Sequence, residues 1–207
     1  MTPKTSRLAS ADVFINLPFD RKHERVFLAL IAGLVSLGLN PRSVLQIAPS
    51  KDRLRRLHDV MSQCPFSLHD LCRVQLSTAG GHRVPRFNMP FELGLAVGIA
   101  LADSRQRYEW RTLEQKAYRI QASLSDIAGY ETSIHHGTVE GTLEALLDIF
   151  ERLQSPPLDD LDDLRWVYRH LREYRNTLRR DIFRPKAFAQ LVAAAKVFVD
   201  ERSSVAV

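Results

Sequence analysis

A single glutamate, Glu92, is the residue of this chain whose type and setting most clearly suggest chemistry. It lies in the stretch Arg86-Phe87-Asn88-Met89-Pro90-Phe91-Glu92-Leu93-Gly94. Proline suits the first turn of a helix, so the stretch predicts a helix over 90–102 with Glu92 in its first turn. A carboxylate there can simply complement the helix dipole or complete a capping box. Because the rest of this helix is apolar and we expect it to be buried, Glu92 is a candidate site residue.

The elements that must position Glu92 are predicted to form a parallel sheet with crossover helices. Short apolar runs alternate with helical patterns, which is typical of repeated βαβ units. The expected strands are 11–16, 43–48, 66–72, 109–113 and 132–136, and the expected helices are 22–39, 51–63, 90–102, 118–128 and 138–153. Gly38 is expected near the end of the first helix, Ser50 to cap the second, and Gly80-Gly81 to lie in a loop. The fold class is therefore α/β, a flavodoxin-like doubly wound parallel sheet of about five strands.

Ligands of such sheets bind outside the carboxyl ends of the strands, so the polar residues expected at that edge are the candidate site. They follow several strands and supply carboxylates, amides, imidazoles and a guanidinium. They are Asn16, Asp20, His69, Asp70, Arg73, Asn88, Glu92, Glu114, Tyr118, Gln121, His135 and His136. The simpler interpretations remain open: Asp70 and Asn16 could cap turns, and Arg73 could form a surface ion pair.

The domain organisation changes at Ser155-Pro156-Pro157. Residues 11–154 are predicted to form the α/β domain, and residues 158–202 a C-terminal helical hairpin of helices 159–182 and 185–201. The first of these helices has an acidic start, later arginines and an apolar stripe, which favours an amphipathic helix docked on the body. The alternative is a contact surface for a partner chain or for nucleic acid, but no nucleic-acid motif supports the latter.

Composition limits the class of protein. The 207 residues carry a formal net charge of +5 and are 45% hydrophobic, which permits an anionic ligand without requiring nucleic acid. Cys64 and Cys72 are interpreted as reduced, packed thiols of an intracellular protein. The sequence has neither a bilayer-length apolar run nor a signal-peptide core at its start, so we expect a cytoplasmic protein without membrane contact.

Two other kinds of site are not expected. His135 and His136 could suggest a metal, but neighbouring residues of a strand point to opposite faces and no spaced Cys or His completes a set, so we expect no metal and no cofactor. Ser67, His69 and Asp70 have the residue types of a hydrolytic triad, but triad members meet in space and not along one strand.

Three segments together resemble a known family. Phe14-Ile15-Asn16-Leu17-Pro18-Phe19, His69-Asp70-Leu71-Cys72-Arg73 and Phe91-Glu92-Leu93-Gly94 resemble the opening strand, the aspartate segment and the glutamate motif of nucleoside 2-deoxyribosyltransferases. The same glutamate-centred fold occurs in bacterial TIR-like domains that hydrolyse NAD. With segments 118–121 and 125–129, the pattern is also similar to uncharacterised bacterial proteins of that superfamily. The likeness covers about 12–153.

The resemblance implies cleavage of an N-glycosidic bond. Glu92 would stabilise or attack the cationic sugar, and Asp70 would bind the base or a ribose hydroxyl. Asn16 and Asn88 would orient the sugar or the carboxylate, and Phe19, Asp20, Tyr118 and Gln121 would complete the substrate site. Arg73, with Arg86, would pair with phosphate. The long loop between Arg73 and Asn88, and the flanking of Asp70 by His69 and Arg73, favour a nucleotide such as NAD over a nucleoside.

Other functions stay open from the sequence. The chain could be a non-catalytic nucleotide-sensing module, in a bacterial defence context that only the resemblance implies. It could also be an interaction scaffold that works through its C-terminal helices. Homo-oligomerisation is compatible with each of these functions.

Overall fold

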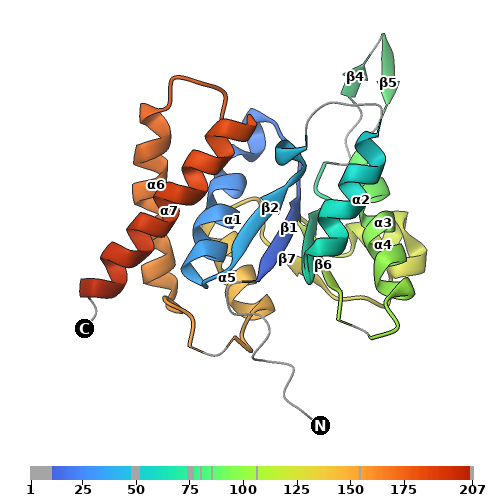
Figure 1. Cartoon of the computed structure of the whole chain (residues 1–207). Helices are drawn as coiled ribbons and strands as arrows, with labels where there is room; N and C mark the ends of the chain where they lie inside the picture. Colours follow the sequence, from blue (N-terminus) through green and yellow to red (C-terminus); the bar gives the residue numbers. More distant parts are fainter. Residues whose placement is uncertain are drawn as a thin grey trace.

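The computed structural model of this chain describes residues 11–47, 52–73, 77–79, 81–84, 86–105, 107–153 and 155–205. A parallel sheet lies at its centre (Figure 1), formed by five strands. They are β1 (Asp12–Asn16), β2 (Asn40–Ser43), β3 (Phe66–Asp70), β6 (Glu109–Glu114) and β7 (Thr132–Ile134). Their order is β2-β1-β3-β6-β7, the flavodoxin-like arrangement, so the predicted α/β fold class is confirmed.

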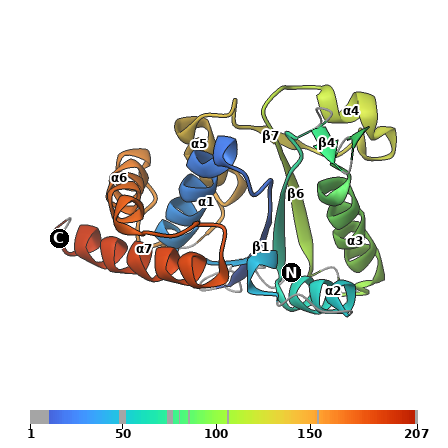
Figure 2. The same cartoon turned by 90° about the horizontal axis from the view of Figure 1, so that it is seen from above.

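Helices cover both faces of the sheet (Figure 2). One face is covered by α1 (Glu24–Ser36) and α5 (Val139–Ile149), and the other by α2 (Arg53–Gln63), α3 (Asn88–Ala102) and the short α4 (Arg119–Ser123). The C-terminal helices α6 (Leu161–Thr177) and α7 (Pro185–Val205) form a further layer outside α1. No helix within the described ranges combines the length and apolarity needed to cross a bilayer.

Helix α1 is apolar all round because it is covered on all sides. Every residue from Val26 to Ser36 is buried, between the sheet on one side and α5, α6 and α7 on the others. Gly33 permits the closest of these approaches, since a Cβ there would lie 2.5 Å from the Leu146 side chain of α5. A helix that is apolar on all sides is typical of a protein core, whereas a surface helix is amphipathic.

The predicted docking of the C-terminal helices on the body is confirmed. Phe183 and Phe188 pack against Phe27 of α1 with ring centroids 5.3 and 6.0 Å apart. At the helix surface, Arg175 of α6 forms an ion pair with Glu24 of α1. The arginines of α6 thus partly serve to join this layer to the body, as the docked interpretation requires.

The second strand was predicted in the wrong place. It spans Asn40–Ser43 and is followed by a 3-10 helix over Val44–Gln46. Pro41 is tolerated because β2 lies at the edge of the sheet and pairs only with β1. The Ser43 side chain accepts from the Leu45 amide and Gln46 reaches back to the Ser43 amide, so a capping box ends the strand early.

Helix α3 differs from the prediction in two ways. It begins at Asn88 and not at Pro90, so Glu92 lies in its second turn; Pro90 is still in the first turn, where amides have no helical partner. The helix is also buried on one side only. Phe91 and Leu101 are exposed, and a Cβ added at Gly94 or Gly98 would meet nothing within 4 Å.

Smaller differences concern the ends of elements. β3 stops at Asp70, because the Asp70 carboxylate accepts the Cys72 amide in a tight turn. The loop around Gly81 is a hairpin of β4 (Ser77–Ala79) and β5 (His82–Val84). The helix predicted over 118–128 breaks at Leu124 into α4 and a 3-10 helix over Ser125–Ile127. The predicted cap at Ser50 lies outside the described residues.

Candidate functional site

Glu92 is a buried carboxylate that forms no ion pair with any residue the structure describes. Its side chain lies on the face of α3 that contains Met89, Leu93 and Ala96, and the residue is only 9% exposed. Oxygen Oε2 is buried and has no hydrogen-bond partner. Burial raises the pKa of Glu92 to about 7, and the charge of Arg53 on α2 offsets only part of this effect. Glu92 also lies a turn further from the helix end than predicted, so it is less able to complement the helix dipole.

Asn16 connects the end of β1 to the start of α3. Its amide nitrogen lies 3.0 Å from Nδ1 of His69 and donates to the Met89 carbonyl at 3.2 Å. Burial lowers the pKa of His69 to about 3, so the ring is neutral. The Asn16 amide donates to Nδ1, and Nε2 therefore has the proton and donates to Ser67 at 2.9 Å. These bonds fix the first turn of α3 on the sheet and thereby position Glu92.

Asp20 is the centre of a cluster of basic side chains after β1. His23 lies 2.9 Å from one carboxylate oxygen, while Arg73 and Arg86 approach the other at 3.5 and 3.9 Å. Burial opposes ionisation of Asp20, but the hydrogen bond from His23 and the charges of His23 and Arg73 outweigh it and lower its pKa. The three predicted site residues Asp20, Arg73 and Arg86 therefore lie together and form a cluster of ion pairs. The Nε donor of Arg73 remains without a partner.

A second polar cluster lies at the ends of β3 and β7. Asp70 Oδ2 is 3.5 Å from His135 Nε2, and Asp70 Oδ1 accepts the Cys72 amide at 2.9 Å. The thiol of Cys72 is 2.9 Å from Nε2 of His23. Burial, together with the Asp70 carboxylate, raises the pKa of this thiol, so a neutral S–H donates to the imidazole. A cavity of about 450 Å³ reaches this cluster and is lined by Lys22, His23, Val26, Cys72, Arg73, Gln115, His135 and Gly137.

The two predicted carboxylates, Glu92 and Asp70, lie on opposite faces of the sheet. Asp70 follows Phe66 and Leu68, which point into the core shared with α1, whereas Glu92 is on α3, against the other face. Among the described residues, the cavity next to Asp70 is not lined by Glu92. The roles predicted for these two residues stay predictions.

The remaining predicted site residues are spread around the same edge. Phe19 packs against Phe27 and Phe183, with ring centroids 6.1 and 5.8 Å apart. Asn88 is exposed in the first turn of α3, and Tyr118 is 82% exposed with a left-handed backbone. Gln121 of α4 has a buried Oε1 without a partner. Of these four residues, Gln121 alone thus presents an unpaired buried polar atom.

Sequence reasoning missed two residues at this edge. Arg119 forms an ion pair with the buried Glu114 and donates to the Cys72 carbonyl at 2.9 Å, which ties α4 to the ends of β3 and β6. His23 was placed inside a helix without a role. The spacing Asp20-x-x-His23 was a usable signal, because the intervening backbone forms a single 3-10 turn that brings the two side chains together.

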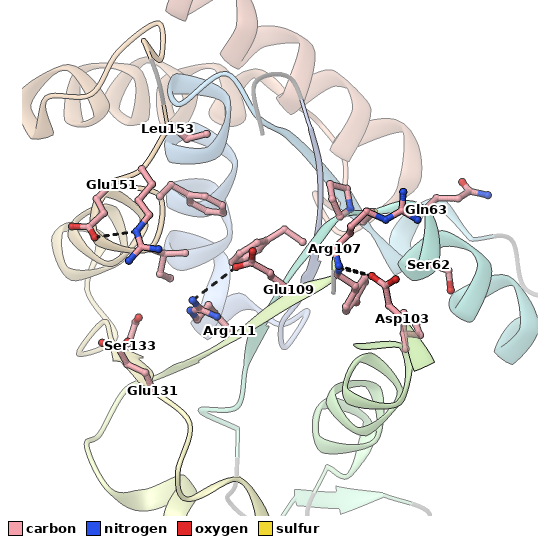
Figure 3. Close-up of a pocket in the computed structure, with 18 of the residues that line it drawn as sticks. Ser62, Gln63, Asp103, Arg107, Glu109, Arg111, Glu131, Ser133, Glu151 and Leu153 are labelled. Carbon is pink, nitrogen blue, oxygen red and sulfur yellow. Dashed lines mark hydrogen bonds and ion pairs between the residues drawn. The ribbon is translucent and has the colours of Figure 1, made fainter. Parts of the chain in front are cut away.

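A larger hollow of about 980 Å³ lies at the opposite, amino edge of the sheet (Figure 3). Its ionic groups neutralise one another locally. Arg111 lies 4.0 Å from Glu109 and Arg152 lies 3.9 Å from Glu151. Asp103 accepts three backbone amides from the turn that follows α3. Among the described lining residues, none has a buried polar atom without a hydrogen-bond partner, and nothing among them points to a ligand.

The comparisons with known proteins add no assignment to this geometry. No family model, no curated protein and no solved structure matched this chain.

Proposed function

We propose that this protein cleaves the N-glycosidic bond of a nucleotide, with Glu92 as the carboxylate that stabilises or attacks the sugar. The observation that carries the proposal is the burial of Glu92, with no ion pair to any described residue, at the carboxyl edge of a flavodoxin-like sheet, where such sheets bind ligands. A buried carboxylate with no partner lowers stability, so its presence favours a role in binding or catalysis over a structural one.

The chemistry follows from the charge that develops in the reaction. As the bond between sugar and base breaks, the sugar becomes an oxocarbenium-like cation, which an adjacent carboxylate stabilises or captures as a glycosyl ester. In a site from which water is largely excluded, this interaction is stronger than in solvent. Asn16 supports the reaction indirectly, because its bond to the Met89 carbonyl anchors the turn that carries Glu92.

Arginine side chains at the same edge of the sheet support a phosphorylated substrate. Arg73 and Arg86 both approach Asp20, and the Arg73 Nε donor has no partner. A guanidinium fork suits phosphate oxygens, so we assign the phosphate group of the substrate to this cluster. NAD and the common nucleotides are the first substrates to test.

The test is release of free base from NAD and from a panel of nucleotides and deoxynucleosides, followed by chromatography. We expect the wild-type protein to release base and Glu92→Gln to do so at least about 100-fold more slowly, because the amide cannot balance the cationic sugar. Glu109→Gln is the matched control, since Glu109 is a half-exposed glutamate in an ion pair at the opposite edge. Base release by Glu92→Gln at the wild-type rate would contradict the assignment. Nucleotide binding without base release would favour the non-catalytic sensing module instead.

A further inference from the structure

Three buried side chains with metal-binding atoms converge where β3 and β7 end. One carboxylate oxygen of Asp70, Sγ of Cys72 and one ring nitrogen of His135 all lie within 4.8 Å of one another. These residues are 1%, 3% and 1% exposed. They come from two separate segments of the chain, 70–72 and 135, which is why spacing along the sequence did not reveal them.

The cluster contains a buried pair of polar atoms that is held by one long contact and forms no hydrogen bond of good geometry. Asp70 Oδ2 and His135 Nε2 are buried and have no hydrogen-bond partner among the described residues, although they lie only 3.5 Å apart. Within the same part of the chain, no lysine or arginine forms an ion pair with Asp70. A buried carboxylate in that position is costly unless a cation compensates its charge.

A second histidine, His23, contacts the Cys72 thiol of this cluster and is already oriented. Nδ1 of His23 faces the Asp20 carboxylate at 2.9 Å, so Nδ1 has the proton and Nε2 presents its lone pair to Sγ of Cys72. A carboxylate that holds the far nitrogen of a histidine is the usual support of a metal-bound imidazole. The Asp70 carboxylate is supported in the same manner, because its other oxygen accepts the Cys72 amide.

We propose that Asp70, Cys72 and His135 form a binding site for a divalent cation of the zinc class, and that His23, which contacts Cys72, moves in as the fourth ligand. Thiolate, imidazole and carboxylate together are a ligand set that zinc accepts in four-coordinate sites. Ligand atoms of tetrahedral zinc lie about 3.3–3.6 Å apart, given bonds of about 2.0–2.3 Å. The Asp70–His135 separation of 3.5 Å already has this value, and the 2.9 Å between Cys72 and His23 must open slightly.

Cation binding requires two proton movements that can be followed. The Cys72 thiol loses its proton to solvent as the metal–sulfur bond forms. His135 now accepts the Gly137 amide on Nδ1, at 3.0 Å, so its own proton is on Nε2. Ligation through Nε2 shifts that proton to Nδ1 and ends the Gly137 hydrogen bond. His23 needs no such change of its protonated nitrogen. Asp70, Cys72 and His135 already converge, so they are the first ligands and His23 is the fourth.

An alternative interpretation is that Cys72, His23 and Asp20 form a nucleophilic Cys-His-Asp triad. The cation site accounts for more of the geometry. A triad has no use for a second carboxylate and a second histidine beside the sulfur, and the Asp70 charge would disfavour a developing thiolate. The cavity of about 450 Å³ that reaches Cys72, His23 and His135 gives the cation a route from solvent.

The experiment measures Co²⁺ and Zn²⁺ binding to the full-length protein after treatment with a chelator. We expect one Co²⁺ per chain, with the near-ultraviolet charge-transfer band of a cobalt–thiolate bond, and displacement of Co²⁺ by Zn²⁺. Cys72→Ser should lose the band and weaken binding at least about 100-fold, and His135→Ala should weaken binding by about 10- to 100-fold. Circular dichroism confirms that each variant is folded.

Matched controls and opposing outcomes come from neighbouring residues. Cys64 is the other buried free cysteine and His136 follows His135 in the chain, so Cys64→Ser and His136→Ala should bind like the wild type. The proposal is overturned if the wild-type protein binds neither ion at micromolar concentration, if Cys72→Ser keeps the band, or if Cys64→Ser removes it. The assay monitors no base release, so its failure is separate from failure of the proposed function.

Discussion

The two edges of the sheet differ in whether their polar and charged side chains are exposed and paired. The amino edge has the larger hollow, about 980 Å³ against about 450 Å³, and two pairs of exposed charged side chains there, Arg111 with Glu109 and Arg152 with Glu151, lie close together (Figure 3). The carboxyl edge has the smaller cavity but contains buried polar atoms without hydrogen-bond partners, namely Asp20 Oδ2, Asp70 Oδ2, Arg73 Nε, Glu92 Oε2, Gln121 Oε1 and His135 Nε2. None of the described residues that line the amino-edge hollow has such an atom.

This difference shows that the size of a hollow is a poor guide to function here. A protein can satisfy polar groups around a large open groove at little cost, because water and neighbouring side chains are available. Buried polar groups without partners lower stability, and their gathering at one edge requires a reason such as a ligand or a cation. The carboxyl edge therefore contains the site in our account, and the amino edge serves as its internal control.

The largest expected effect concerns the pH dependence of base release. Only ionised Glu92 can balance the cationic sugar, and its pKa is about 7. The rate should therefore fall as pH decreases below 7, by roughly 50-fold between pH 7 and pH 5. Rate measurements across this interval check the prediction. A rate that stays constant down to pH 5 would show that the essential group has an ordinary carboxylate pKa and is not Glu92.

A smaller effect should separate the phosphate from the rest of the substrate. Arg73→Ala removes a guanidinium from the Asp20 cluster, and we expect KM for the nucleotide substrate to rise about tenfold. KM for the corresponding nucleoside should not change. Arg111→Ala, at the amino edge, should leave both values at the wild-type level. Steady-state kinetics with the two substrates measure these KM values. An equal change in KM for nucleotide and nucleoside would argue against a phosphate at Arg73.

The fold could be predicted from the sequence because its signals are local and repeated. The buried strands β1 and β3 and the long apolar run of α1 predict a doubly wound sheet with helices on both sides. The position of β2 could not be predicted, since Pro41 argues against a strand unless its place at the edge is known. The exposure of one side of α3 could not be predicted either, because its sequence is apolar on every side and only the packing determines which side is covered.

The site could be predicted in part. Glu92, Asn16, Asp20, Asp70 and Arg73 were expected at the carboxyl edge because each follows a strand or starts a helix, and the structure places them there. The contacts among them could not be derived. Whether a side chain after β3 points toward α3 or toward α1 depends on the pleat, and this separates Glu92 from Asp70. The cluster of Cys72 with His23 and His135 likewise depends on which strands are neighbours.

The most direct test of the central claim is the difference in unfolding free energy between Glu92→Gln and the wild type as a function of pH. The folded protein binds a proton at Glu92 more tightly than the unfolded chain does, because burial raises the folded pKa from 4.5 to about 7. Wild-type stability should therefore fall, relative to Glu92→Gln, by about 3 kcal/mol between pH 4.5 and pH 8, as denaturant titration can measure. The control Glu109→Gln should show a difference below about 0.5 kcal/mol over the same interval. A Glu92→Gln difference that does not change with pH would contradict the claim that this edge contains an uncompensated buried charge.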